Sequence, residues 1–309
     1  MSEPLLIAQH LARRYGARVA VEDVTLRLER GEVLGLLGLN GAGKSTTLRM
    51  LAGVLAPHRG TVTLHGCDLA RAPLAAKRHL GYLPEIPPLF PDATVDEYLA
   101  FCARLHAVPA ARVAASVARA RARCHLQDVG TRVIRNLSKG FQQRVGIAQA
   151  IVHEPAVLIL DEPTVGLDPA QIREVRELVR ALRDEHAVLL STHLLNEAES
   201  TCSRVAILHE GRIVYDADPA AAPRAVRIAF KSPPPLTALQ ATLGDVHVQG
   251  LPDGGYDLVT ADPDAALARL IAAAARERWN LCEISTGRST LERTFLEVTR
   301  DHVPRAASA

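Results

Sequence analysis

Nine consecutive residues have the composition of a phosphate-binding loop. They read Gly38-Leu-Asn-Gly-Ala-Gly-Lys-Ser-Thr46 and fit the pattern G-x-x-x-x-G-K-[ST]. Glycines allow a tight turn in which successive N–H groups face one anion, and the N-terminus of a following helix adds positive charge. The predicted nucleotide-contacting residues of this loop are Gly38, Asn40, Gly41, Ala42, Gly43, Lys44, Ser45 and Thr46.

Two side chains of this loop have a defined chemistry. The ammonium group of Lys44 reaches the β- and γ-phosphates in this motif, and the hydroxyl of Ser45 is a ligand for Mg²⁺. The loop follows the apolar run Val33 to Leu37 and precedes a helical pattern from Ser45 to Leu51. Because the motif requires this strand–loop–helix context, the sequence predicts a nucleotide site in which Lys44 is also catalytic.

Two carboxylates follow a second apolar run. Ala156 to Leu160 leads directly into Asp161 and Glu162. Ligands of open α/β sheets bind beside the carboxyl ends of the strands, so these carboxylates are expected near the phosphates. An acidic pair at a strand end also occurs as a helix cap. Together with the phosphate loop, the pair predicts that Asp161 holds Mg²⁺ and that Glu162 polarises the attacking water.

A histidine follows a third apolar run. Val188 to Leu190 is followed by Ser191-Thr-His-Leu, which contains His193. A lone histidine is more often a structural hydrogen-bonding partner than a catalytic group. The expected position of His193, at the end of a third strand of the same sheet, predicts a contact with the γ-phosphate. No second ligand at zinc-binding spacing accompanies it, which argues against a zinc site.

Strands and helices must together position these side chains. Up to about residue 216, strand-like apolar runs alternate with helical stretches, which indicates an α/β domain with a largely parallel sheet. Short continuous apolar runs indicate strands buried on both faces. The segment from Arg204 to Tyr215 predicts a hairpin that turns at Glu210 and Gly211.

A helical insert interrupts this alternation between Pro91 and Arg135. Residues Thr94 to Glu97 have a capping-box pattern, and the apolar residues that follow have helical spacing. The stretch from Ala110 to Leu126 is rich in alanine and arginine. It fits either a nucleic-acid contact or a solvated helix, and the solvated helix is the more common meaning of such a charge run.

A second, smaller domain is predicted after a linker at Ala217 to Ala225. Residues 226–230 and 256–260 have strand patterns, and Asp264 to Trp279 has one apolar helical face. The pattern Ser289 to Glu292 predicts the start of a last helix. We therefore expect a small α+β domain over residues 226–300 and a flexible tail over residues 301–309.

The composition excludes several classes of protein. With 309 residues, 48% hydrophobic residues and a net charge of +2, the chain is neither disordered nor basic enough for binding dominated by nucleic-acid phosphates. No apolar run approaches the roughly 20 residues of a spanning helix, and no secretory signal is visible. The five scattered cysteines form no C-x-x-C pair, which argues against disulfides and thiolate metal sites. We expect a cytoplasmic protein that binds no nucleic acid.

The motifs together resemble the nucleotide-binding subunits of ABC transporters from about Leu5 to Asp216. Leu137-Ser-Lys-Gly-Phe-Gln-Gln-Arg144 is similar to the family's signature loop, usually LSGGQ, although Lys139 and Phe141 depart from it. Val165-Gly-Leu-Asp-Pro169 matches the D-loop. The resemblance implies ATP contacts by Ser138, Lys139, Gly140 and Asp168, and stacking of adenine on Tyr15, which by itself also fits an ordinary half-buried strand residue.

One position departs from the family in a way that changes charge. The resemblance places a glutamine that senses the γ-phosphate and touches the membrane partner where Gly81-Tyr-Leu-Pro-Glu85 has a carboxylate. Mg²⁺ accepts carboxylate as well as amide oxygens, so Glu85 is predicted to bind the metal or its water. The predicted metal-binding residues are Ser45, Asp161 and Glu85.

The resemblance implies a fold and an activity. The fold is the P-loop NTPase fold of ABC ATPases, an α/β domain over residues 1–220 with a mostly parallel core sheet, N-terminal antiparallel strands and a helical subdomain at about residues 91–140. The activity is Mg²⁺-dependent hydrolysis of ATP to ADP and phosphate. Catalysis would be carried out by Lys44, Glu162 and His193, and ATP would bind between two subunits in a head-to-tail dimer.

The resemblance narrows further to ATPases that drive ABC-2-type exporters, because of GYLPE, LSKGFQQR and the end Leu291-Glu-Arg-Thr-Phe-Leu-Glu-Val-Thr299. It implies a separately encoded transmembrane permease, a homodimer or a heterodimer with a paralogue, and a peripheral location on the cytoplasmic face of the inner membrane. The alternative is a soluble single-cassette ATPase with a regulatory or assembly role. Intact Lys44, Asp161 and Glu162 argue against a cassette that binds ATP without cleaving it, and only Glu85 favours one.

Overall fold

The computed structural model describes residues 4–219, 224–251, 254–260, 262–286 and 290–299. Contacts divide the chain into two compact units, Met1–Ala217 and Asp218–Ala309, and each is described by itself. None of the helices within the described ranges is long and apolar enough to cross a membrane.

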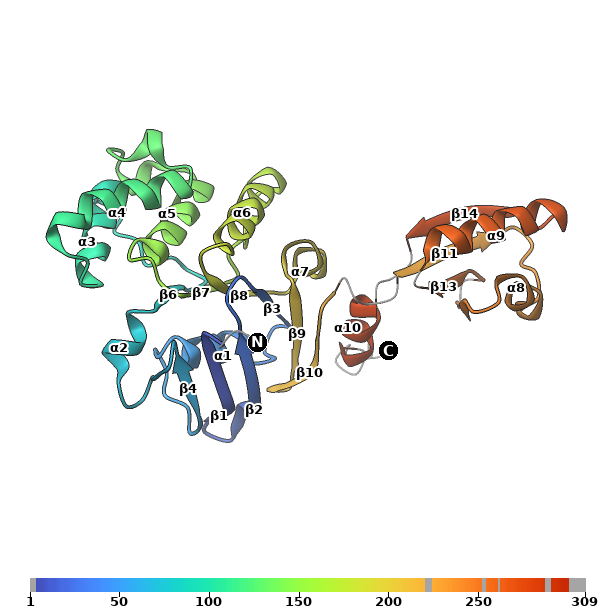
Figure 1. Cartoon of the computed structure of the whole chain (residues 1–309), viewed down its shortest axis with the longest axis horizontal. Helices are drawn as coiled ribbons and strands as arrows, with labels where there is room; N and C mark the ends of the chain where they lie inside the picture. Colours follow the sequence, from blue (N-terminus) through green and yellow to red (C-terminus); the bar gives the residue numbers. More distant parts are fainter. Residues whose placement is uncertain (1–3, 220–223, 252–253, 261, 287–289, 300–309) are drawn as a thin grey trace, which may run out of the picture. The chain divides into compact units, whose positions relative to one another are not determined.

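Within residues 4–217, the first unit has ten strands and seven α-helices, and Figure 1 shows how they are arranged. The strands are β1 (Leu6–Tyr15), β2 (Arg18–Leu28), β3 (Val33–Leu37), β4 (Arg59–Leu64), β5 (Cys67–Asp68), β6 (Leu80–Leu83), β7 (Val157–Asp161), β8 (Ala187–Thr192), β9 (Arg204–His209) and β10 (Arg212–Ala217). The helices are α1 (Lys44–Leu51), α2 (Pro73–Lys77), α3 (Val95–Leu105), α4 (Ala110–Arg123), α5 (Lys139–Ile151), α6 (Pro169–Leu182) and α7 (Leu195–Thr201), with 3-10 turns at Gln127–Val129 and Ile134–Asn136.

The strands form one sheet in the order β5-β4-β1-β2-β10-β9-β3-β8-β7-β6. The pairs that connect β9, β3, β8, β7 and β6 are parallel. The strands β1, β2, β4 and β5 pair antiparallel. The predicted mostly parallel core and antiparallel N-terminal strands are therefore confirmed. The predicted hairpin is also present, because β9 and β10 pair antiparallel around Glu210 and Gly211, both with positive φ.

The centre of the sheet positions the predicted site. Every residue of β3, β7 and β8 is buried, as expected for apolar strands covered on both faces. These three strands are neighbours and run in the same direction, so the segments that follow them meet at one edge. One hydrophobic core joins α1 to both parts of the sheet; it includes Leu48 of α1, Leu6 of β1 and Ile159 of β7.

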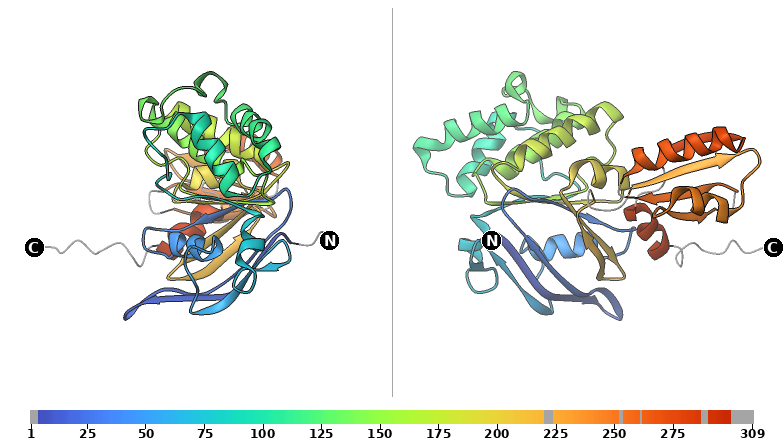
Figure 2. Two further views of the ribbon diagram at one scale, coloured as in Figure 1. Left: turned by 90° about the vertical axis from the view of Figure 1, so that its left-hand side faces the viewer. Right: turned by 45° about the vertical axis from the view of Figure 1, so that its right-hand side comes forward.

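The helical part of this unit packs α3, α4 and α5 against one another (Figure 2). The predicted capping box at the start of α3 is present, with the Thr94 hydroxyl and the Glu97 carboxylate bonded to each other's backbone N–H. The α4 helix buries one apolar face. Three of its arginines, Arg119, Arg121 and Arg123, form ion pairs with carboxylates, as a solvated helix does.

In the described part of the second unit, four strands form an antiparallel sheet, and the helices α8 and α9 pack on it. Its elements are β11 (Arg224–Phe230), α8 (Leu236–Leu243), β12 (His247–Gly250), β13 (Tyr256–Thr260), α9 (Pro263–Arg276), β14 (Leu281–Thr286) and α10 (Thr290–Thr299). The sheet order is β12-β13-β11-β14. Alternate residues of β11, namely Val226, Ile228 and Phe230, form a core with Leu239 of α8 and Leu270 of α9.

Strands extend into the predicted linker from both sides. Ala217 ends β10, and β11 already begins at Arg224, which pairs with Thr260. Apolar alternation does not reveal this start, because a backbone ladder includes residues of any side-chain type. Ser289 of the predicted capping box and the predicted tail over residues 301–309 lie outside the described residues.

Candidate nucleotide site

A cavity of 460 Å³ lies at the edge of the sheet where β3, β7 and β8 end. It brings together predicted residues that are far apart in the sequence. The predicted residues that line it are Tyr15, Asn40, Gly41, Gly43, Lys44, Ser45, Thr46, Glu85, Glu162 and His193. A cavity of this size with a few convergent polar groups is typical of a small-ligand site.

The phosphate loop connects β3 to α1 as its motif requires. Gly43 has a φ of 108°, and a Cβ at this position would lie 2.4 Å from the carbonyl oxygen of Ala20. Both the left-handed backbone and the close approach therefore require glycine. The Lys44 ammonium donates to the carbonyl oxygen of Gly38 at 2.8 Å, which holds the buried lysine side chain along the loop.

Asp161 lies behind the loop and is joined to it through hydroxyl groups. Its Oδ1 accepts a hydrogen bond from Ser191 Oγ at 2.6 Å and lies 3.5 Å from Ser45 Oγ. The carboxylate is 1% exposed and has no ion pair with any residue that the structure describes. A buried carboxylate without a cation is costly, and hard oxygen donors are the ligands of Mg²⁺. Asp161 and Ser45 thus fit a Mg²⁺ site.

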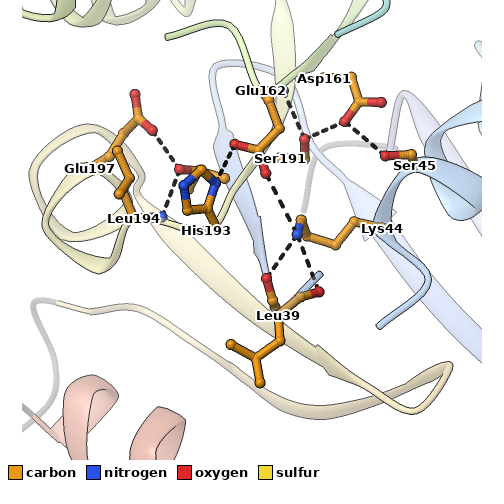
Figure 3. A network of polar contacts seen from close by, with 11 residues as sticks. Leu39, Lys44, Ser45, Asp161, Glu162, Ser191, His193, Leu194 and Glu197 are labelled. Carbon is orange, nitrogen blue, oxygen red and sulfur yellow. Dashed lines mark hydrogen bonds and ion pairs between the residues drawn. The ribbon is translucent and has the colours of Figure 1, made fainter. Parts of the chain in front are cut away.

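Glu162 is held in a strained position between a lysine and a histidine (Figure 3). Its φ of 48° places a non-glycine residue in the left-handed region, which costs of order 1–3 kcal/mol. Its backbone N–H donates to Ser191 Oγ at 2.9 Å. The carboxylate oxygens lie 3.6 Å from Lys44 Nζ and 2.8 Å from His193 Nδ1. Strain at a buried carboxylate in a cavity is a frequent property of catalytic positions.

The loop that carries His193 is anchored through Thr192 to the buried carboxylate of Glu197. Thr192 Oγ1 donates to Glu197 Oε2 at 2.5 Å and accepts from the N–H of Leu194 at 3.0 Å. Glu197 in α7 is 1% exposed, and Arg176 of α6 lies 3.8 Å from it. The imidazole of His193 itself is partly exposed beside Glu162 (Figure 3).

Glu85 lines the cavity from the loop after β6. The preceding strand contains Tyr82, whose carbonyl oxygen accepts a 2.9 Å hydrogen bond from Gln149 of α5. Burial raises the pKa of the Tyr82 hydroxyl, and the nearby Asp161 carboxylate raises it further. The strand from which the Glu85 loop emerges is thus bonded to α5, and its Tyr82 lies in the negative field of Asp161.

The predicted ATP contacts of the signature loop and the D-loop, Ser138, Lys139, Gly140 and Asp168, do not line this cavity, although Val165 at the start of the D-loop does. Ser138 is the N-cap of α5, and its hydroxyl accepts from the N–H of Phe141. Lys139 lies over the D-loop, because a Cβ on Gly166 would be 2.0 Å from its Nζ. Gly140 packs against Gln171 in the same way. Asp168 is the N-cap of α6. Gly38, Ala42 and Asp161 also lie outside the lining, as parts of the loop and of the layer behind it.

Two residues of the site were not predicted from the sequence. Ser191 joins the backbone of Glu162 to the Asp161 carboxylate, and only its position beside a strand end hints at this. Arg18 lines the cavity, and its guanidinium lies 3.4 Å from where a Cβ on Gly41 would be. Its side chain has no ion pair or hydrogen bond within the described part of the chain. A single arginine after a turn belongs to no recognisable motif, so the sequence did not indicate Arg18.

Replacing Arg18 with alanine is expected to weaken ATP binding about tenfold, because a guanidinium bound to a phosphate contributes a charge-assisted hydrogen bond. An equilibrium titration with labelled ATP measures this change. Arg14→Ala is the matched control, since Arg14 is an exposed arginine of the preceding strand outside the cavity. Equal affinities in the two variants would show that Arg18 does not contact the nucleotide.

Solved structures share this fold. The structure described as the ATP-binding subunit of an ABC transporter aligns with a TM-score of 0.64 and 30% identity, over 86% of this chain and 99% of that one. The sequence profile described as ABC transporter matches residues 21–165, which include the phosphate loop and the two acidic residues at the end of β7, Asp161 and Glu162. Fold and site therefore define a P-loop ATPase of the ABC type.

Curated relatives define the family. The ABC transporter ATP-binding protein NatA of Bacillus subtilis is 36% identical over 198 residues, which are 63% of this chain and 80% of NatA. The Nod factor export ATP-binding protein I of Paraburkholderia xenovorans is 37% identical over 222 residues, 72% of this chain and 73% of that protein. The chain belongs to the family of ABC transporter ATP-binding proteins, and it is an ATPase.

Proposed function

We propose that this subunit powers an ABC-2-type exporter by Mg²⁺-dependent ATP hydrolysis between two subunits arranged head to tail. The observation that carries this proposal is the division of the predicted ATP contacts. The phosphate loop, Glu162 and His193 line one cavity, whereas Ser138 lies outside it at the start of α5. A second subunit that supplies its own α5 would complete the site.

The hydrolytic step follows from the positions of three side chains. Glu162 accepts a proton from the water that attacks the γ-phosphate, and Lys44 holds the β- and γ-phosphates. His193 uses one ring nitrogen for Glu162, which leaves the other for the γ-phosphate. Asp161, Ser45 and Glu85 hold the metal. Mg²⁺, when bound, neutralises part of the triphosphate charge.

The dimer converts this chemistry into movement. The hydroxyl of Ser138 and the backbone N–H groups at the start of α5 would cap the γ-phosphate of the partner's ATP. ATP then stabilises the closed dimer and loss of the γ-phosphate reopens it, because the ligand binds the two states with different affinity. Within one subunit, the hydrogen bond from Gln149 to Tyr82 links α5 to β6, the strand that precedes the loop of Glu85.

The exporter assignment is supported by relatives and by sequence. One similar protein is named for Nod factor export. The residues Gly81 to Glu85, the loop after Leu137 and the C-terminal segment that ends at Thr299 resemble those of ABC-2-type export ATPases. We assign the chain to the cytoplasmic face of the inner membrane, bound to a separately encoded permease.

An exposed apolar patch next to the Glu85 loop supports a permease contact. We use the name aromatic patch for the two rings of Phe90 and Phe101 together with the apolar residue Ile86, which follows Glu85 in the chain. Their exposed fractions are 82%, 48% and 44%, and the rings of Phe90 and Phe101 lie 5.2 Å apart. Exposed aromatic clusters are typical of protein interfaces, and this one follows directly after a residue that lines the nucleotide cavity.

The double variant Ile86→Ser/Phe90→Ser is expected to lose at least about tenfold in affinity for the permease, since truncating anchor residues at the centre of an interface costs about 2 kcal/mol or more. Its ATPase rate in isolation should stay at the parental value, because neither residue lines the cavity. Purification of the tagged chain from membranes of its native host, with identification of the co-purified protein, measures the effect.

A control is Val54→Ser, which removes a hydrophobe that is 64% exposed and lies outside the aromatic patch. A parental chain that co-purifies with no membrane protein would contradict the proposed function and favour the soluble regulatory role. Parental co-purification by the double variant would contradict only the assignment of the patch.

A further inference from the structure

A second polar cavity, of 380 Å³, lies at the opposite end of α5 from Ser138. Four segments form its walls: the end of α2, the end of α3, the first turns of α4 and the residues after α5. The 13 residues of α5 separate it from the signature loop by about 20 Å at 1.5 Å per residue. This cavity, which we call the basic cavity, is therefore distinct from the nucleotide site.

The side chains of the basic cavity carry excess positive charge. Arg78, Arg112 and Arg119 line it, against the single carboxylate of Glu154. Arg119 is already neutralised, since its Nε lies 2.8 Å from Glu154 Oε1. Arg78 and Arg112 have no ion pair or side-chain hydrogen bond with any residue in the described ranges. The cavity thus holds two uncompensated guanidinium groups, contributed by different helical elements.

Two stacked histidine rings form an uncharged part of the wall. The rings of His106 and His153 are stacked with centroids 3.7 Å apart and planes at 8°. Burial lowers the pKa of His106 and lowers that of His153 to about 3, so neither ring carries charge at neutral pH. His153 Nε2 bonds to the carbonyl oxygen of Leu80 at 3.0 Å, which fixes the stack to the start of β6. Positive charge at neutral pH therefore comes from the arginines alone.

We propose that the basic cavity binds the phosphate group of a small phosphate ester, held between Arg78 and Arg112 over the His106 ring. Guanidinium groups match the oxygens of phosphate with paired, charge-assisted hydrogen bonds. Two uncompensated cations balance the two negative charges of a phosphate monoester. The volume is in the range of small-ligand pockets, which leaves room for the organic part of an ester.

Glycerol 3-phosphate is the probe for this site, titrated calorimetrically into the full chain. The Lys44→Ala background removes the main phosphate contact of the other cavity. We expect saturable binding that weakens at least about tenfold in Arg78→Gln/Arg112→Gln, because two charge-assisted contacts are lost. The control Arg71→Gln/Arg104→Gln removes two exposed arginines outside the cavity and should change affinity less than about twofold. Thermal unfolding checks that each variant is folded.

A second arm identifies the source of the phosphate group. Phosphatidylcholine vesicles with and without phosphatidic acid are sedimented with the same variants. Binding that requires phosphatidic acid, Arg78 and Arg112, and that glycerol 3-phosphate displaces, assigns a lipid headgroup. Binding of glycerol 3-phosphate without vesicle binding assigns a soluble ester. The proposal is overturned if the probe does not bind saturably, or if the double variant and its control bind equally well.

Discussion

Replacing Glu162 with glutamine is expected to reduce ATP turnover at least about 100-fold while leaving ATP binding intact. The amide has nearly the same shape as the carboxylate, so it preserves the packing of a side chain that is 8% exposed. It does not accept the proton of the attacking water. The unreacted γ-phosphate should then hold two subunits together, and ATP should convert the variant to a stable dimer.

Phosphate release at steady state and gel filtration with ATP and Mg²⁺ measure the two effects of Glu162→Gln. The matched control is Glu177→Gln, which neutralises an exposed glutamate of α6 away from the cavity. Hydrolysis at the parental rate would show that Glu162 does not activate water. Lost turnover without a dimer would retain the catalytic role but contradict the proposed assembly.

Replacing Lys44 with alanine is expected to weaken ATP binding about 100-fold and to abolish turnover. The Lys44 side chain is 6% exposed, so its hydrogen bonds to phosphate form with little competition from water. The variant also removes the cation that lies 3.6 Å from the Glu162 carboxylate. The uncompensated carboxylate then repels the γ-phosphate. The loss should be largest for ATP, smaller for ADP and slight for adenosine.

Equilibrium titrations with these three ligands test the assignment of Lys44. Lys77→Ala is the control, because it removes an exposed lysine from α2, outside the nucleotide cavity. An equal loss of affinity for ATP and adenosine would mean that Lys44 supports the fold of the loop and does not contact the terminal phosphates. The Lys44 and Glu162 variants thus separate binding from chemistry in one site.

The sequence was sufficient to predict which side chains come together at the candidate cavity, for a physical reason. Buried parallel strands appear as short apolar runs, and each of the three central runs is followed by a reactive group at its C-terminal end: Lys44, Asp161 and His193. Parallel pairing then places those ends at one edge. Both the fold and most of the predicted lining of the candidate cavity follow from this arrangement.

The finer geometry did not follow from residue types. Ser191 meets Asp161 only because β7 and β8 pair in one particular register. Arg18 faces the phosphate loop because a turn of the antiparallel strands lies beside it. The separation of Ser138 from the cavity is a property of how α5 packs, and no spacing in the chain reveals it. Such contacts depend on tertiary structure.

The left-handed backbone conformation at Glu162 favours a different type of residue from the glutamate that is proposed to act in the reaction. Glycine adopts this conformation without steric cost, and asparagine adopts it more readily than glutamate does. The side chain that the fold would favour here is therefore not the one that the proposed hydrolytic step needs. Under the proposed role of Glu162, selection for thermal stability alone would tend to remove the proton acceptor. The strain at Glu162 would then be folding stability that is given up for ATP hydrolysis.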